Sequence, residues 1–317
     1  MSNETLTNRH DFLLLFEVTN GNPNGDPDAG NMPRIDPNSN RGIVTDVCLK
    51  RKVRNFVELF APARTTGTDN GFNILIKQGA VIETEQKPAI AAAKDKDNPE
   101  QLAGATEAER AANWLCREFY DVRTFGGVLS TGDDIMKGSA WGQVRGPVQF
   151  TFGQSYDPIT PLEVSITRCA VTKEADAKKE RTMGNKHIIP YALYAAKGYV
   201  SPAFAERTGF TQVDLDLLFE ALVHMFEHDR SAARGEMIVR GIYDFEHVGT
   251  QPDPYSGQNK REARLGCAHA HELFEGIKVQ LRPDKDFPAS FVDYVVENTW
   301  TEATLPKGVR LHLRHIK

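Results

Sequence analysis

The chain has 317 residues, of which 40% are hydrophobic and 26% are charged, a composition typical of folded soluble proteins and long enough for about two domains. This composition excludes a disordered or collagen-like chain, and four singly placed cysteines exclude a CxxC metal site or a disulfide scaffold. The net charge of −5 argues against a wholly basic nucleic-acid binder but leaves local basic patches open.

No targeting or membrane segment is visible in the sequence. Unbroken apolar runs such as Phe12 to Phe16 are far shorter than the roughly 20 residues that a membrane-spanning helix needs. Residues 1–11 are polar and charged, without the basic head and apolar stretch of a secretory signal. We therefore expect a cytoplasmic protein with free thiols and no membrane partner.

The first predicted element is a buried strand at Asp11–Thr19, which is apolar and bounded by turn formers. Asn20–Gly42 follows and holds eight glycines and prolines, so we expect a long loop without regular structure. Long loops in compact domains are usually functional, and backbone amides in such a loop can follow a phosphate backbone.

A helix is predicted from Thr45–Asp46 to just before Pro62. Its apolar residues recur on one face at helical spacing: Leu49, Val53, Phe56, Val57 and Phe60. Lys50, Arg51 and Arg54 lie off that face and form a cationic strip beside it.

The remaining elements define the expected fold class. After a mostly helical insertion that ends in a helix at Thr106–Tyr120, strands are predicted at Gln149–Phe152, Leu162–Thr172, Tyr191–Val200, Met237–Val248 and Val309–Arg314, with a helix at Val213–Phe226. Without the insertion, the order is the split βαβ pattern of an α+β, ferredoxin-like or RNA-recognition-motif fold. Lys173–Lys186 is charged and poor in apolar residues, so it should project as a hairpin or arm.

Three sequence patterns resemble metal-binding motifs, and each also has a simpler structural interpretation. His224-Met-Phe-Glu-His228 matches the helical HxxEH of inverted zinc peptidases but also suits a structural helix. Cys267, His269 and His271 share one side if extended, which suits either a transition metal or a hydrogen-bonding cluster. The loop from Asn20 lacks the first Asp and the closing Glu of a calcium loop. We expect no metal and no cofactor.

A glycine-rich turn at Arg123–Gly132 carries an Arg, a Phe and hydroxyls, and Lys137 and Arg145 flank it. It is not a Walker loop, because it contains no GKS or GKT. Phe125 is either a core residue or an aromatic that stacks on or wedges apart bases. The sequence contains no GxSxG and no nucleotide fingerprint, so it indicates a binding module rather than an enzyme.

Four segments together resemble a known family. Asn20–Arg34, Val44–Arg54, Arg123–Val128 and Gly142–Phe150 closely resemble the large backbone subunit of the type I-C CRISPR Cascade complex, in the RAMP superfamily. The resemblance runs from the first strand to beyond Arg240.

The resemblance implies a hand-like shape: a modified RNA-recognition-motif palm, a helical finger insertion and a protruding thumb hairpin. The implied divisions are palm at 1–60, fingers at 61–115, palm at 116–171, thumb at 172–189 and palm at 190–317. It also implies a non-catalytic protein that polymerises head to tail along the guide RNA, with other Cascade subunits. Each thumb displaces one guide base, and target DNA pairs with the bases between.

Such a subunit must hold guide phosphates and sugars and leave base edges free. We expect Arg34, Arg41, Lys50, Arg51, Arg54, Arg123 and Arg145 to contact phosphates, and Phe125, with Thr124 and Met183, to act as the wedge. Gly126 and Lys137 belong to the same RNA-binding set, and Lys178, Lys179, Arg181 and Lys186 would draw the thumb to phosphate. The alternative is a metal-dependent RNA endonuclease that uses loop aspartates: Asp26, Asp28 or Asp36.

Overall fold

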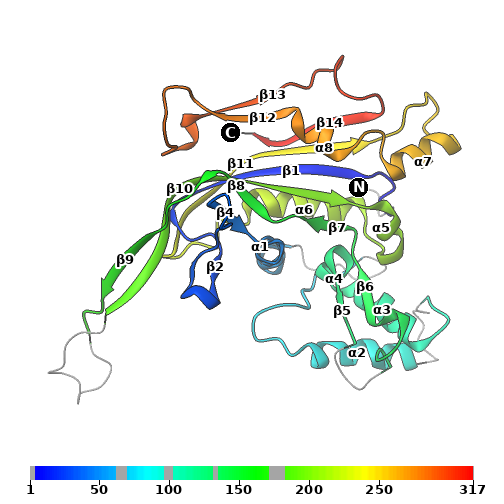
Figure 1. Cartoon of the computed structure of the whole chain (residues 1–317). Coiled ribbons are helices and arrows are strands. Elements are labelled where there is room, and N and C mark those ends of the chain that lie inside the picture. Colours follow the sequence, from blue (N-terminus) through cyan, green and yellow to red (C-terminus); the bar gives the residue numbers. More distant parts are fainter. Residues whose placement is uncertain (1–3, 62–69, 96–102, 131–134, 171–182, 317) are drawn as a thin grey trace.

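The centre of the molecule is one antiparallel sheet (Figure 1). The structure, a computed structural model, describes residues 4–61, 70–95, 103–130, 135–170 and 183–316. The strand order is β14–β11–β1–β10–β8–β4, and β7 and β9 also pair with β10. These strands are β1 (His10–Gly21), β4 (Arg41–Val44), β7 (Val148–Phe150), β8 (Gly153–Pro158), β9 (Leu162–Thr167), β10 (Met183–Val200), β11 (Arg234–His247) and β14 (Val309–Ile316). In the described ranges, no helix is long and apolar enough to cross a membrane.

Strand β1 lies inside the sheet and is covered on both faces. It pairs antiparallel with β10 on one side and with β11 on the other. Phe12 and Phe16 belong to one hydrophobic core, and Leu13 and Leu15 belong to a second core on the opposite face. Burial on both faces explains why this strand reads as a continuous apolar run, and the predicted strand is confirmed.

Three helices cover the first face of the sheet: α1 (Asp46–Phe60), α5 (Pro202–Thr208) and α6 (Gln212–His224) (Figure 1). The predicted bounds of α1 are confirmed. Thr45 caps it by accepting a hydrogen bond from the Cys48 amide at 3.3 Å. Thr211 and Asp214 form a capping box at the start of α6, and this helix lies where the sequence predicts one.

The C-terminal segment covers the other face (Figure 1). It consists of α7 (Gly257–Leu265), α8 (Ala270–Glu275), a hairpin of β12 (Ile277–Leu281) and β13 (Tyr294–Asn298), and the short helix η4 (Phe291–Asp293). Leu273 and Phe274 of α8 pack with Leu13, Leu15 and Phe245 of the sheet. This layer was not predicted from the sequence; the final strand that was predicted, β14, belongs to the central sheet.

A separate helical unit stands below the sheet and α1 (Figure 1). Its elements are α2 (Ile82–Lys94), α3 (Glu107–Glu118), α4 (Tyr120–Phe125), β5 (Gly126–Val128), η2 (Ala140–Gly142) and β6 (Gln143–Arg145). It has its own hydrophobic core, to which Leu129 and Met136 contribute as well as Leu115. This core therefore includes residues beyond 115, where the predicted finger segment ends.

The Gly/Pro-rich loop is more regular than predicted. Its middle forms a small hairpin of β2 (Gly25–Asp26) and β3 (Met32–Pro33), joined by the short helix η1 (Pro27–Ala29). The Asn22 side chain donates to the Asn31 carbonyl at 2.7 Å. Hydrogen bonds from side chains to the backbone thus hold this hairpin together. Prediction of regular structure from the sequence depended on apolar periodicity, which this segment lacks.

A two-stranded ribbon projects from the sheet (Figure 1). It pairs β9 with the first residues of β10, from Met183 opposite Thr167 to Ile188 opposite Leu162. Strand β10 therefore begins eight residues before the predicted Tyr191. The predicted thumb at 172–189 is described only from Met183 onward, and Lys178, Lys179 and Arg181 lie outside the described residues.

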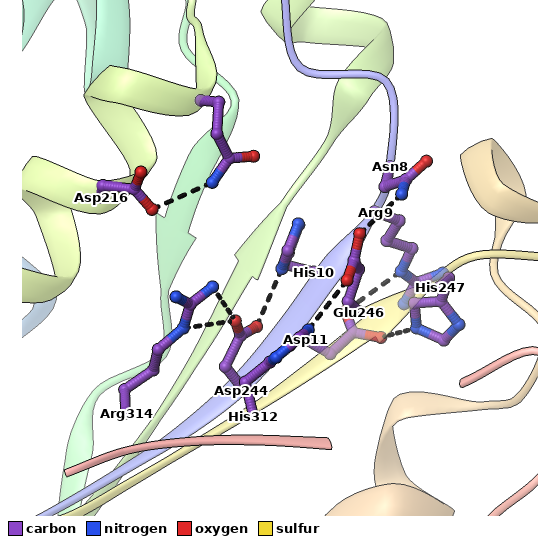
Figure 2. A network of polar contacts seen from close by, with 11 residues as sticks. Asn8, Arg9, His10, Asp11, Asp216, Asp244, Glu246, His247, His312 and Arg314 are labelled. Carbon is purple, nitrogen blue, oxygen red and sulfur yellow. Dashed lines mark hydrogen bonds and ion pairs between the residues drawn. The ribbon is translucent and has the colours of Figure 1, made fainter. Parts of the chain in front are cut away.

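Buried charges join β1, β11 and β14 at one end of the sheet (Figure 2). His10 Nδ1 lies 2.9 Å from one oxygen of Asp244, and Arg314 Nη2 lies 2.9 Å from the other. His247 Nε2 lies 2.9 Å from Asp11. Asp244 and Asp11 are fully buried, so the charge of each depends on its partners in place of water.

Candidate nucleic-acid interface

The basic helix α1 is fixed by the loop that precedes it. Asn24 Oδ1 accepts hydrogen bonds from both the amide and the hydroxyl of Thr45, each at 2.9 Å. Leu49 and Val53, on the apolar side of α1, are buried in the core beneath the sheet. Packing and capping thus set which residues of α1 reach the surface.

The three predicted basic residues of α1 differ in exposure. Arg51 is exposed and donates weakly to Gln78 Oε1 at 3.4 Å. Lys50 is half-buried, with its Nζ 3.1 Å from both Asp46 Oδ2 and Gln149 Oε1. Lys50 and Arg51 therefore remain candidates for contact with an anionic backbone.

Arg54 departs from the predicted cationic strip because it is buried. Its Nε donates to Asp121 Oδ2 at 2.8 Å, and the same carboxylate accepts from the amides of Leu75 and Ile76. The charge of Arg54 is therefore paired inside the protein and does not lie on the predicted surface strip.

A glycine hairpin lies beside α1. Strands β5 and β6 pair with Gly126 opposite Arg145. Gly126 has φ of 75°, and a Cβ there would lie 2.2 Å from the Val144 carbonyl oxygen. The backbones of the hairpin thus approach too closely for a side chain at this position. Arg145 is exposed.

Gly126 itself serves the fold. Its amide donates to the Val122 carbonyl and ends α4, so that amide is already used within the protein. A Cβ on the next residue, Gly127, would meet no atom within 4 Å. The open side of the hairpin is therefore at Gly127.

Arg123 is enclosed, and no part of its side chain is exposed for the predicted phosphate contact. Its guanidinium lies 2.7 Å from Asp214 Oδ1 and donates to the carbonyls of Cys116 at 2.7 Å and Gly71 at 3.0 Å. It joins the helical unit to α6. A sequence pattern shows an arginine beside a glycine turn but not the distant aspartate that pairs with it.

Two of the three residues of the predicted wedge, Thr124 and Phe125, are enclosed in the protein. Thr124 is fully buried, and Phe125 is 6% exposed and belongs to the core beneath the sheet. The Phe125 ring packs near Phe150, with ring centroids 6.3 Å apart. Of the two readings that the sequence left open, the structure supports the core residue.

The other predicted residues are spread over the molecule. Arg41, Lys137 and Met183 are exposed, and Arg34 and Lys186 are half-buried. Arg34 lies 3.4 Å from Asp26, near the loop hairpin, whereas Met183 and Lys186 lie on the projecting ribbon (Figure 1). Arg145 lies in the glycine hairpin, and Lys50 is connected to the hairpin through Gln149.

Gln149 links these elements and was missed by the sequence reasoning. It accepts a hydrogen bond from Lys50 and donates to the Gly146 carbonyl at 3.2 Å. Gly146 directly follows Arg145, so one path of contacts joins α1 to the hairpin. The alternation of Val148, Gln149 and Phe150 was the available signal, because it places Gln149 on the exposed side of its strand.

The histidine pattern at His224 does not form a zinc helix. Helix α6 ends at His224, so His228 lies outside it and the one-turn spacing is lost. The His224 and His228 rings pack against Phe56 and Phe60, with centroids 6.2 and 4.5 Å apart. In the part of the chain that the structure describes, no group of three or more His, Cys, Asp or Glu side chains could hold a metal.

Cys267, His269 and His271 are not on a strand, because α8 begins at Ala270. The Cys267 amide instead donates to His247 Nδ1 at 2.9 Å. Since Nδ1 accepts, the proton of a neutral His247 ring lies on Nε2, which faces Asp11. The segment thus serves the polar contacts at the end of the sheet.

Two of the three aspartates of the endonuclease alternative, Asp26 and Asp36, form contacts within their own loop. Asp26 faces Arg34 and accepts from the Asp28 amide at 3.2 Å. Asp36 accepts from the Asn38 amide at 3.0 Å and from the Ser39 hydroxyl at 2.6 Å. The Ser39 hydrogen bond is the main cause that lowers the pKa of Asp36.

A family model described as CRISPR-associated protein Cas7 matches residues 8–299. The chain belongs to the Cas7 family. The Cas7 match runs from the residues before β1 to the end of β13, so it includes the helical unit and leaves β14 outside.

A curated relative from Haloferax volcanii, also described as CRISPR-associated protein Cas7, is 30% identical over 230 residues. That alignment covers 68% of this Cas7 chain and 63% of the relative, so the chain spans less than two thirds of the relative's length.

Among solved structures, a chain of a "CRISPR RNA-guided surveillance complex, pre-nicking" has a TM-score of 0.44 and 15% identity, over 78% of this chain and 80% of that one. A chain of the type III-B Cmr-beta complex bound to cognate target RNA has a TM-score of 0.40 and 12% identity, over 74% and 60%.

Proposed function

We propose that this Cas7 chain is a non-catalytic backbone subunit of a type I-C CRISPR surveillance complex, binding guide RNA through its phosphates and sugars. Membership of the family supports the class of function. The structural observation that carries the proposal is the contact path from Lys50 through Gln149 to Arg145 at the glycine hairpin.

This surface suits the sugar-phosphate backbone of an RNA that must be bound without recognition of its base sequence. Lys50, Arg51 and Arg145 supply positive charge, and Gln149 supplies a polar amide. Gly127 leaves the approach to the hairpin open. Cations and amides that contact phosphates fix the position of a strand but carry no sequence information, which a guide for many targets requires. Target DNA would then pair with the exposed base edges.

The architecture supports a hand-like assignment. Strands β7, β10, β1 and β11 with helices α1 and α6 on one face would be a modified ferredoxin-like palm. The helical unit with its own core would be the fingers, and the ribbon of β9 and β10 would lead to the thumb.

The ribbon also supports head-to-tail assembly with further copies of the chain. Leu162, Val164 and Ile166 lie on one side of β9 and are 41–47% exposed, and Met183 is 72% exposed. Packing on a neighbouring copy would remove this exposed apolar surface from water. A head-to-tail contact whose repetition does not close into a ring builds a filament. Other Cascade subunits would cap its ends.

The decisive experiment is to express the chain alone and run what copurifies on a denaturing gel, before and after ribonuclease. We expect retained RNA in protected lengths that step by a constant increment. Failure to retain RNA, both alone and when coexpressed with a guide and the partner subunits, would overturn the proposal. Stepwise shortening of a bound guide in magnesium would instead favour the endonuclease.

A further inference from the structure

A cleft of about 470 Å³ separates the helical unit from α5. Ala112 and Cys116 of α3 form part of its wall, with Trp141 and Arg145 from the segment η2–β6 and Arg207 from the last turn of α5. Its volume lies within the range of small-molecule sites, so it can hold one nucleotide.

The chemistry of the cleft is aromatic and cationic. Trp141 is 37% exposed, whereas Phe125, the aromatic that the sequence favoured for stacking, is 6% exposed. An indole that borders a cleft and remains accessible to solvent can stack on any base through its π-face. Trp141 is therefore an aromatic of this cleft that can contact a base.

Two guanidinium groups border the same cleft without an acid. Arg145 and Arg207 are both exposed, and neither forms an ion pair with another described residue. Arg207 lies 6.0 Å from the Phe204 ring, which does not neutralise its charge. Two unpaired arginines beside an indole favour an anionic ligand with a planar group, because guanidinium pairs with phosphate and stacks on rings.

The polar wall of the cleft is held in place from behind. The Cys116 carbonyl, at the end of α3, accepts from buried Arg123 at 2.7 Å. The Asn113 side chain donates to the Ala103 carbonyl at 2.7 Å. An amide held in this way gives the wall a fixed polar group rather than a mobile one.

The cleft is continuous with the proposed phosphate-binding surface. Arg145 borders the cleft and pairs with Gly126 in the hairpin, and Gln149 connects the following residue to Lys50. A strand whose phosphates lie along Lys50 and Arg145 can thus turn one base into the cleft without leaving the protein.

We propose that this cleft binds one unstacked base of a single-stranded RNA, with Trp141 stacking on the base and Arg145 and Arg207 contacting its phosphates. This inference rests on the proposed function and adds a base-binding site to a surface otherwise assigned to the backbone. It also gives the aromatic role to Trp141 in place of the buried Phe125.

The test compares a short oligouridylate with an abasic oligonucleotide of the same length and charge, by fluorescence anisotropy. Trp141→Ala should weaken binding of the oligouridylate about tenfold and leave binding of the abasic strand unchanged. Trp141→Phe should restore most of the loss, because a phenyl ring also stacks. Tyr255→Ala, which removes a distant side chain that is 80% exposed, is the matched control and should change neither affinity.

Arg207→Gln provides a second variant on another element. It should weaken binding of both strands and reduce the salt dependence, because it removes a phosphate contact. If the wild type binds both strands and Trp141→Ala affects them equally or not at all, the base site is wrong and the proposed RNA binding stands. If the wild type binds neither strand, the base site is wrong, and the proposed function is overturned as well when coexpression with a guide and the partner subunits also yields no retained RNA.

Discussion

Arg123 and Asp214 form an ion pair between the helical unit and α6, with Nη2 2.7 Å from Oδ1 and neither side chain more than 1% exposed. Two carbonyls, those of Cys116 and Gly71, satisfy further donors of the guanidinium. A second buried pair, Arg54 with Asp121, lies at the same junction. The two buried ion pairs therefore join these parts of the molecule alongside the apolar contacts of Tyr120 and Phe125.

Removing Arg123 should destabilise the whole chain, because Asp214 would remain buried without its partner. We expect Arg123→Ala to lower the free energy of unfolding by about 3–5 kcal/mol, measured by denaturant titration. The control Arg145→Ala, at an exposed position, should change it by about 0.5 kcal/mol or less. Equal effects of the two substitutions would contradict the assigned role of the pair.

Truncating Phe125 tests whether its ring stabilises the core or wedges guide bases apart. The ring packs in the core, with the Arg54 guanidinium 5.2 Å and Lys50 Nζ 5.8 Å from its centroid. Phe125→Ala should therefore cost about 3–5 kcal/mol of folding free energy. Phe152→Ala, at a side chain that is 57% exposed, is the control and should cost about 0.5 kcal/mol or less. Unchanged stability with altered exposure of guide bases would restore the wedge.

Lys50 should contribute to RNA binding through charge. Lys50→Gln is expected to weaken binding of any RNA sequence alike and to reduce the slope of log affinity against log salt by about 1. Lys278→Gln removes an exposed lysine of β12, on the opposite face of the sheet, and should leave the slope unchanged. A slope that Lys50→Gln does not alter would remove Lys50 from the phosphate-binding surface.

Acid should destabilise the protein through the charges in Figure 2. Burial opposes ionisation of Asp244, but His10 and Arg314 outweigh it, so the pKa of Asp244 lies below its ordinary value of 3.8. The pKa of Glu246 is also lowered from 4.5, since Asn8 and His312 outweigh its burial. A lowered native pKa means that the unfolded chain takes up the proton first. The contribution of these groups to the free energy of unfolding is thus fully present above pH 4.5. It is lost as the pH falls through their lowered pKa values in the folded protein.

The measurement is the free energy of unfolding as a function of pH. Asp244→Asn should lower stability at neutral pH and flatten the curve below pH 4, because the titrating group is gone. A variant whose acid limb has the same slope as that of the wild type would show that other carboxylates cause the acid instability.

Local sequence signals predicted much of the fold. Thr45, the apolar spacing that follows it and Pro62 were sufficient for both ends of α1, because capping and periodicity act within a few residues. Strands β1, β11 and β14 were equally visible from alternation or continuous apolarity.

The candidate site was predicted less well, because burial is decided at long range. Lys50 and Arg54 are one turn apart on one helix, yet only Arg54 meets a carboxylate from α4. Arg123 looked like a surface cation until Asp214, far along the chain, was placed beside it. Trp141 follows no pattern that marks a cleft, since three separate elements create the space around it.

The position of β1 in the sheet bears on synthesis. Both partners of this apolar strand lie late in the sequence, since His10 pairs with Val200 and with Glu246. At about 5–20 residues per second, a ribosome needs roughly ten seconds or more to supply the first partner. During that interval Phe12 to Phe16 has no partner strand, so the nascent chain should depend on chaperones that shield hydrophobic segments.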